Sequence, residues 1–196
     1  MSNRFAVPML RPEDVIPHLA KGIEHWRDGR SAKELARRWW DAGGFPPSVR
    51  QILLGAPEWK GAEFVEAKFE HQTDLGTLGR ASQSDLLVVA RTSDGMGIVA
   101  VEGKADETFG KIVDEWLGTD VDKSNAPEIK GSSATISSGK WARLKSLCET
   151  LGLDTKDVMS MRYQLLHRTV AALLEAKAVQ LPPSSCPRPS FFKRTR

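Results

Sequence analysis

Cysteine is scarce in this chain of 196 residues, which has only Cys148 and Cys186. Cys148 lies in an apolar segment that fits a helix, and Cys186 lies in a segment rich in proline and serine. Neither has the paired spacing of a zinc site, and the two do not predict a disulfide framework. The sequence therefore argues against the small disulfide-stabilised class and against a cysteine-based metal centre.

Long apolar runs are also lacking. No stretch approaches the ~20 apolar residues that a membrane-spanning helix needs, and the first residues lack the apolar core of a signal peptide. No G-x-x-x-x-G-K-[ST] phosphate-binding loop occurs. We therefore expect a cytoplasmic protein without a membrane partner and without this class of nucleotide site.

A strong overall charge is missing as well. The net charge of +3 depends on residues 181–196, which hold four basic residues and no acidic one. Without these four of the 28 basic residues, the 25 acidic residues outnumber the remaining basic ones by one. A nearly neutral body lacks the broad basic surface of a constitutive nucleic-acid binder. Nucleic-acid contacts would have to come from local patches, from a bound metal or from the basic tail.

The length predicts one domain. Helices are expected over 12–55, the core of a sheet over 60–104, an insert over 105–155 and a core helix over 156–178, all within an α/β domain spanning 1–180. Residues 181–196 contain four prolines and four basic residues, a composition typical of disordered or extended chain.

The helices are predicted from capping residues and apolar spacing. A first turn is expected at Pro12, and Ser31 with Glu34 forms the pattern of a capping box at the start of a second helix. Gly43-Gly44 should end that helix, and Pro46-Pro47 should start a third one. Helices are also expected over 112–117, over 140–151 before Gly152, and over 159–178, where Leu166, Val170, Leu173 and Leu174 form an apolar stripe.

Two apolar runs, 85–90 and 98–102, are predicted to be strands joined around the turn dipeptide Asp94-Gly95. Both runs are apolar on both faces, which favours a sheet covered by helices on each side. Residues 63–69 fit a strand, and a helix is nearly as compatible with them.

Polar residues with chemical potential stand at the ends of these two strands. Asp85 opens the first run, and Glu102 and Lys104 close the second. Glu102 and Lys104 are two residues apart and should point to the same face. A hairpin symmetric about Asp94 would place Asp85 opposite Gly103 and on the other face, and a shift of one residue would bring it to the same face.

Two carboxylates and a lysine suit metal-assisted phosphodiester hydrolysis. Magnesium prefers hard oxygen ligands such as carboxylates and a backbone carbonyl. The bound ion lowers the pKa of its water, and a neighbouring lysine can orient that water or stabilise the negative charge of the transition state. The simpler interpretation is a surface ion pair between Glu102 and Lys104.

The chain resembles an uncharacterised bacterial domain family related to the PD-(D/E)XK nuclease superfamily. The motifs that carry the resemblance lie in residues 79–86, 101–110 and 162–169, and the resemblance as a whole covers about residues 14–178. The resemblance implies a restriction-endonuclease-like α/β core with a central mixed sheet flanked by helices, N-terminal helices and a helical insert. It also implies a nuclease that uses Mg²⁺ or Mn²⁺ and acts on nucleic acid, DNA more than RNA.

The same resemblance assigns roles to individual residues. Asp85, Glu102 and the carbonyl of Gly103 would bind the metal, and Lys104 would assist catalysis together with Asp85 and Glu102. A further metal ligand from the first core helix would be Glu34, which also fits the capping box as a purely structural residue. The helix after the motif would present Gln164 as a catalytic residue, with His167 and Arg168 as further candidates; a half-exposed helix position is the alternative for His167.

The chain departs from the superfamily pattern at two places. Ser84 stands where a proline usually precedes the first aspartate, and the Pro/Arg tail replaces a strand that usually follows the last helix. A missing strand would leave an exposed sheet edge. Two alternatives to a nuclease therefore stay open: an inactive nuclease-like fold that serves as a binding or interaction module, and a truncated or frame-shifted C-terminus that leaves an inactive product.

Overall fold

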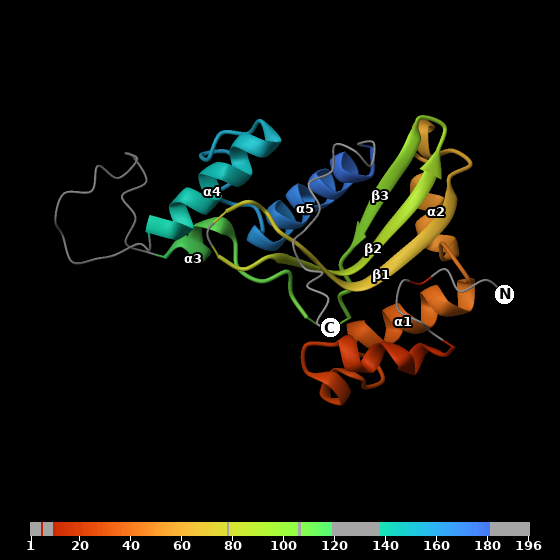
Figure 1. Cartoon of the computed structure of the whole chain (residues 1–196). Helices are drawn as coiled ribbons and strands as arrows, with labels where there is room; N and C mark the ends of the chain where they lie inside the picture. Colours follow the sequence, from red (N-terminus) through yellow and green to blue (C-terminus); the bar gives the residue numbers. More distant parts are fainter. Residues whose placement is uncertain (1–4, 6–9, 78, 106, 119–137, 181–196) are drawn as a thin grey trace, which may run out of the picture.

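The computed structural model describes residues 5, 10–77, 79–105, 107–118 and 138–180. Helices flank a three-stranded sheet (Figure 1). In chain order, the 3₁₀ and α helices and the strands are η1 Pro12–His18, η2 Gly22–His25, α1 Ser31–Ala42, α2 Pro47–Leu53, η3 Pro57–Trp59, β1 Glu63–Thr73, β2 Ser82–Thr92, β3 Gly95–Val101, α3 Val113–Leu117, α4 Ser138–Leu151 and α5 Tyr163–Gln180.

The sheet has the order β1-β2-β3, and both neighbouring pairs are antiparallel. The α/β class is confirmed, but the prediction of a mixed sheet is wrong for the described strands. Residues 63–69 belong to a strand, so the helical alternative is wrong. The turn between β2 and β3 is formed by Ser93 and Asp94 alone, because both strands extend further than their apolar runs.

Strand β2 is buried on both faces. Leu86, Val88 and Ala90 belong to a first hydrophobic core, whereas the alternating Leu87 and Val89 are buried on the opposite face. Helix α5 packs against β2 and β3. Helices therefore cover both sides of the central strand, as its apolar sequence predicts. Strand β3 lies at an edge of the described sheet and is mostly half-buried.

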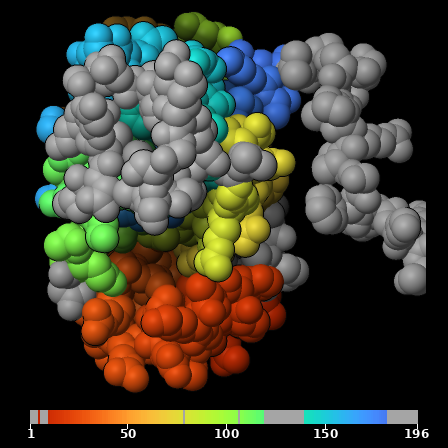
Figure 2. All heavy atoms as spheres, turned by 90° about the vertical axis from the view of Figure 1, so that its left-hand side faces the viewer, coloured from red at the N-terminus to blue at the C-terminus, as the bar shows by residue number. Residues whose placement is uncertain are grey.

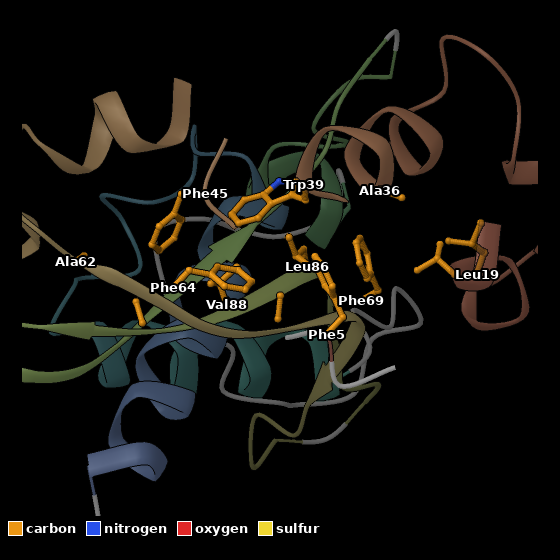
Figure 3. Close-up of a cluster of buried hydrophobic side chains, with 13 residues drawn as sticks. Phe5, Leu19, Ala36, Trp39, Phe45, Ala62, Phe64, Phe69, Leu86 and Val88 are labelled. Atoms are coloured by element: carbon orange, nitrogen blue, oxygen red, sulfur yellow. The ribbon is translucent and has the colours of Figure 1, made fainter. Parts of the chain in front are cut away.

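The first core joins the sheet to the N-terminal helices and is rich in aromatic rings. It includes Phe5, Leu19, Ala36, Trp39, Phe45, Ala62, Phe64, Phe69, Leu86 and Val88 (Figure 3). A second core joins α3, α4 and α5 through Val113, Leu117, Leu144, Leu147, Cys148, Leu166, Val170 and Ala171, together with Leu75 and Val158. Figure 2 shows the N-terminal helices and α4 at opposite ends of this view of the molecule.

Helix α1 ends as its sequence predicts but begins differently. Gly43 has the left-handed φ of 57° that suits glycine at a helix C-terminus. The N-cap residue is Arg30, and no side chain caps this end of the helix. The hydroxyl of Ser31 instead donates to Oε1 of Glu107 at 3.1 Å. The predicted capping box of Ser31 and Glu34 is therefore wrong.

The last two helices follow the prediction with shifted boundaries, since α4 begins at Ser138 rather than at 140 and α5 ends at Gln180 rather than at 178. Helix α4 ends at Leu151, and Gly152 follows with a φ of 68°. Helix α5 begins at Tyr163 rather than at Met159. The carbonyls of Met159 and Met161 accept hydrogen bonds from the first amides of α3, so these residues bind another helix instead of joining α5.

Part of the predicted insert, residues 119–137, and the predicted disordered tail, residues 181–196, lie outside the described residues. Within the described part of the chain, none of the helices combines the length and the apolar character that crossing a membrane requires.

Candidate functional site

The sheet register brings three carboxylates to one level. Leu86 pairs with Val101, so the next position along the same register sets Asp85 opposite Glu102. In β1, Phe69 pairs with Leu86 and His71 pairs with Ser84, which sets Glu70 opposite Asp85. The register is thus shifted by one residue from a hairpin centred on Asp94. We call Glu70, Asp85 and Glu102 the acidic row.

Asp85 is mostly buried and lies against the segment that follows β3. Its Oδ2 accepts a hydrogen bond from the backbone amide of Gly103 at 2.8 Å. Burial, followed by repulsion from Glu102, raises the pKa of Asp85 to about 6. A nearby cation would favour the charged form of this carboxyl group.

Glu102 is the most strongly paired member of the row. Its Oε1 accepts hydrogen bonds from Nζ of Lys104 at 2.9 Å and from Nε2 of Gln164, and its Oε2 accepts from Nε of Arg168 at 2.7 Å. Only 10% of the Glu102 side chain is exposed. The structure therefore brings Lys104, Gln164 and Arg168 together around Glu102. The catalytic roles that the resemblance implies for these residues stay predictions.

Glu70 was missed by the sequence analysis. Its backbone φ of 51° is the one positive value among the described non-glycine residues. Such a conformation costs roughly 1–3 kcal/mol in a non-glycine residue and often occurs at functional sites. Nε2 of Gln83 donates to Glu70, while burial, followed by repulsion from Asp85, raises the pKa of Glu70 to about 7. Only a known register could have revealed this residue from the sequence.

The acidic row opens into a pocket of about 280 Å³. We call it the acidic pocket; its walls include Ser31, Ala32, Glu70, Gln83, Asp85, Glu102, Gly103, Lys104, Gln164 and Arg168. Residues from α1, the sheet and α5 thus meet at one place. Glu34 lies on α1 and is not among the residues that line this pocket, so its metal role stays a prediction without a supporting contact.

The donor chemistry of the acidic pocket suits a hard divalent cation in part. Asp85, Glu102 and the carbonyl of Gly103 are oxygen donors of the kind that Mg²⁺ and Mn²⁺ accept. Among the described residues, however, no group of three or more His, Cys, Asp or Glu side chains is arranged to hold a metal. Lys104 and Arg168 already neutralise Glu102. The pair Asp85 and Glu102 remains as the candidate set of carboxylate ligands.

His167 turns away from the acidic pocket. Its Nδ1 lies 2.9 Å from the hydroxyl oxygen of Ser82, which also accepts a hydrogen bond from Arg168 at 2.9 Å. Burial, followed by the positive charge of Arg168, lowers the pKa of His167 to about 4, so its imidazole is neutral at physiological pH. This places His167 in a neighbouring pocket rather than beside the carboxylates.

The chain belongs to the family described as domain of unknown function (DUF6946), whose model matches residues 8–184. No curated protein and no solved structure matches the chain. The family description names no activity. The resemblance to the PD-(D/E)XK superfamily, its bacterial origin and the restriction-endonuclease-like core therefore stay predictions.

Proposed function

We propose that this protein is a metal-dependent nuclease that hydrolyses nucleic-acid phosphodiester bonds at the acidic pocket. The observation that supports the proposal is the meeting of Asp85 from β2 with Glu102 and Lys104 from the segment after β3, all in that pocket. Asp85, Glu102 and the Gly103 carbonyl would hold Mg²⁺ or Mn²⁺. The cytoplasm as compartment and DNA rather than RNA as substrate belong to the same proposal.

The chain's own residues divide the remaining tasks. A bound Mg²⁺ would lower the pKa of water and neutralise phosphate oxygens. The ammonium group of Lys104 lies beside Glu102 with 21% of its side chain exposed, so it can approach a phosphate and stabilise developing negative charge. Gln164 and Arg168 hold the Glu102 carboxylate from α5 and fix its orientation.

A second function, a binding or interaction module without catalysis, is favoured by one observation. Both carboxylate oxygens of Glu102 already accept hydrogen bonds from Lys104, Gln164 and Arg168. Such a network can stabilise the fold without any metal. This alternative predicts that neither metal binding nor cleavage depends on Asp85.

Replacement of Lys104 by alanine tests the nuclease proposal directly. The wild type should cleave DNA in millimolar Mg²⁺ or Mn²⁺, and Lys104→Ala should lower the rate by about 100-fold or more, because a group that stabilises transition-state charge is lost. Lys145→Ala, an exposed position on α4, is the matched control and should cleave at the wild-type rate. Equal rates for all three proteins would exclude the role assigned to Lys104.

Thermal melts separate metal binding from substrate choice. A metal that binds only the folded state must raise the melting temperature. We expect Mn²⁺ to raise that of the wild type and of the exposed control Asp157→Asn, but not that of Asp85→Asn. The same response in all three proteins would show that Asp85 holds no metal and would favour the binding module.

A further inference from the structure

A second pocket lies beside the acidic one, on the other side of Ser82. It has a volume of about 510 Å³, within the range of small-molecule sites. Its walls bring together three cations and three rings, from Arg80, Trp116, Lys140, Arg143, Tyr163 and His167. We call it the basic aromatic pocket.

The described lining of this pocket carries positive charge. Its lining residues, all within the described part of the chain, include Arg80, Lys140 and Arg143 but no carboxylate. A third pocket, near η2 and α1, offers the contrast because its cations are accompanied by Glu24 and Glu107. The cations of this described lining favour an anionic ligand.

Arg143 holds the pocket's loop in place. It is only 9% exposed, and its guanidinium donates to the hydroxyl of Tyr163 at 2.7 Å, to that of Thr77 at 3.0 Å and to the carbonyl of Arg80 at 2.7 Å. The backbone of Arg80 is therefore fixed against α4 and α5, while its side chain is exposed. An exposed guanidinium on an anchored backbone is well suited to contact a phosphate.

Aromatic rings also line this pocket. The rings of Trp116 and Tyr163 stack at 3.7 Å with an interplanar angle of 8°, and the imidazole of His167 lies 5.0 Å from the Tyr163 ring. Nζ of Lys140 donates to the carbonyl of Trp116 at 2.7 Å and lies over its ring. Flat apolar rings beside cations are the combination that proteins use for an unpaired base and its phosphate.

A short hydrogen-bonded bridge connects the two pockets. Arg168 contacts Glu102 in the acidic pocket and also donates to the hydroxyl of Ser82, and that hydroxyl contacts His167 in the basic aromatic pocket. The two sites are therefore one side-chain bridge apart. A single polynucleotide strand could contact both.

We propose that the basic aromatic pocket binds a nucleotide of a single-stranded segment next to the phosphodiester bond that is cleaved. Arg80 and Lys140 would contact its phosphate, and Trp116 and Tyr163 would contact its base. This inference rests on the proposed nuclease function and adds the form of the substrate, a locally unpaired strand.

Fluorescence anisotropy with a labelled single-stranded DNA of about 15 nucleotides, in EDTA to prevent cleavage, tests the inference. Arg80→Ala should raise the dissociation constant by about three- to tenfold and reduce the slope of log K against log salt by about 0.7, the value for one lost phosphate contact. Lys140→Gln should weaken binding similarly, with its fold checked by thermal melting.

The matched control is Arg91→Ala. Arg91 is an exposed arginine on β2, nine residues from Ser82 and hence about 30 Å away along the strand. It should bind like the wild type. Equal weakening in Arg80→Ala and Arg91→Ala would indicate a general charge effect and would overturn the inference, as would a wild type that binds no DNA strand.

Asp85→Asn distinguishes this inference from the nuclease proposal. It should lose cleavage and the Mn²⁺-dependent stabilisation, yet bind the DNA strand at least as tightly as the wild type, because it removes a negative charge. If the wild type cleaves DNA but Arg80→Ala binds the strand as tightly as the wild type, only the nucleotide site in the basic aromatic pocket would be refuted. If Arg80→Ala binds the strand more weakly but the wild type does not cleave DNA, only the proposed nuclease activity would be refuted.

Discussion

At the scale of single residues, positive charge is shared unequally along the acidic row. Glu102 has the two cations Lys104 and Arg168 as partners, whereas Asp85 accepts a backbone amide and Glu70 accepts a side-chain amide. Burial without a cation raises the pKa of an acid. Within the described residues, Glu70 and Asp85 thus bond directly to amides rather than to a cation, and Asp85 is the one of the two that belongs to the candidate ligand pair.

This imbalance predicts how stability depends on pH. The pKa of Glu70 rises from 4.5 to about 7, so the folded state binds more protons than the unfolded chain between these values. The contribution of Glu70 to folding is then fully present below about pH 4.5 and is lost as the pH rises through 7. Glu70→Gln should therefore gain stability relative to the wild type at about pH 8, by roughly 1–2 kcal/mol after allowance for partial exposure.

Thermal or urea unfolding at about pH 5 and about pH 8 measures this difference. The control is Glu63→Gln, an exposed position on the same strand, which should show little pH-dependent change. If the difference in unfolding free energy between Glu70→Gln and the wild type were the same at both pH values, Glu70 would not retain its proton in the folded state.

At the scale of elements, Arg143 joins three segments. From α4 it binds the loop before β2, through Thr77 and the Arg80 carbonyl, and it binds α5 through Tyr163. Gly79 lies close to this contact, since a Cβ atom there would be 3.1 Å from the Arg143 guanidinium. The position of the loop before β2, the strand that contains Asp85, therefore depends on the buried guanidinium of Arg143.

Arg143→Met should be destabilising by about 2–4 kcal/mol, because it leaves buried polar groups of the loop and of Tyr163 without their donor. For a chain of this size that corresponds to a melting temperature lower by roughly 5–15 °C. Lys145→Met on the exposed side of α4 should change it little. A small change in Arg143→Met would show that the loop holds its position without the guanidinium.

At the scale of the whole molecule, the family match ends at residue 184, and α5 ends at Gln180. The composition of residues 181–196 predicts that they add nothing to the packed core. A chain ending after Gln180 should therefore melt within about 2 °C of the full chain, since tails that are not packed contribute little to stability.

Light scattering after size exclusion, at a low and a high protein concentration, completes that comparison. We expect the molecular mass of each chain, full-length or truncated, to be the same at both protein concentrations. Concentration-dependent aggregation of the full chain would indicate an exposed sheet edge at β3. A large loss of stability on truncation would instead show that the tail packs on the domain.

Local patterns in the sequence were enough to find most elements. The glycines after α1 and α4, the prolines at the start of α2 and the apolar runs of β2 and β3 act over a few residues, where backbone preference and side-chain period decide the conformation. The local predictions that are wrong share one cause, which is a hydrogen bond to a residue far away in the sequence. Ser31 bonds to Glu107, 76 residues away, and Met159 and Met161 bind α3.

The sequence by itself determined that Asp85 lies in one strand and that Glu102 and Lys104 stand at the end of the next, because these positions depend on local alternation and a turn. The prediction that Asp85 begins its strand is wrong, since β2 begins at Ser82. Tertiary structure alone decided that Asp85 faces Glu102, that Glu70 joins them, and that Gln164 and Arg168 reach across from α5. A shift of one residue between strands reverses which face a side chain occupies. That register is set by packing of the whole sheet against its helices, which no short segment encodes.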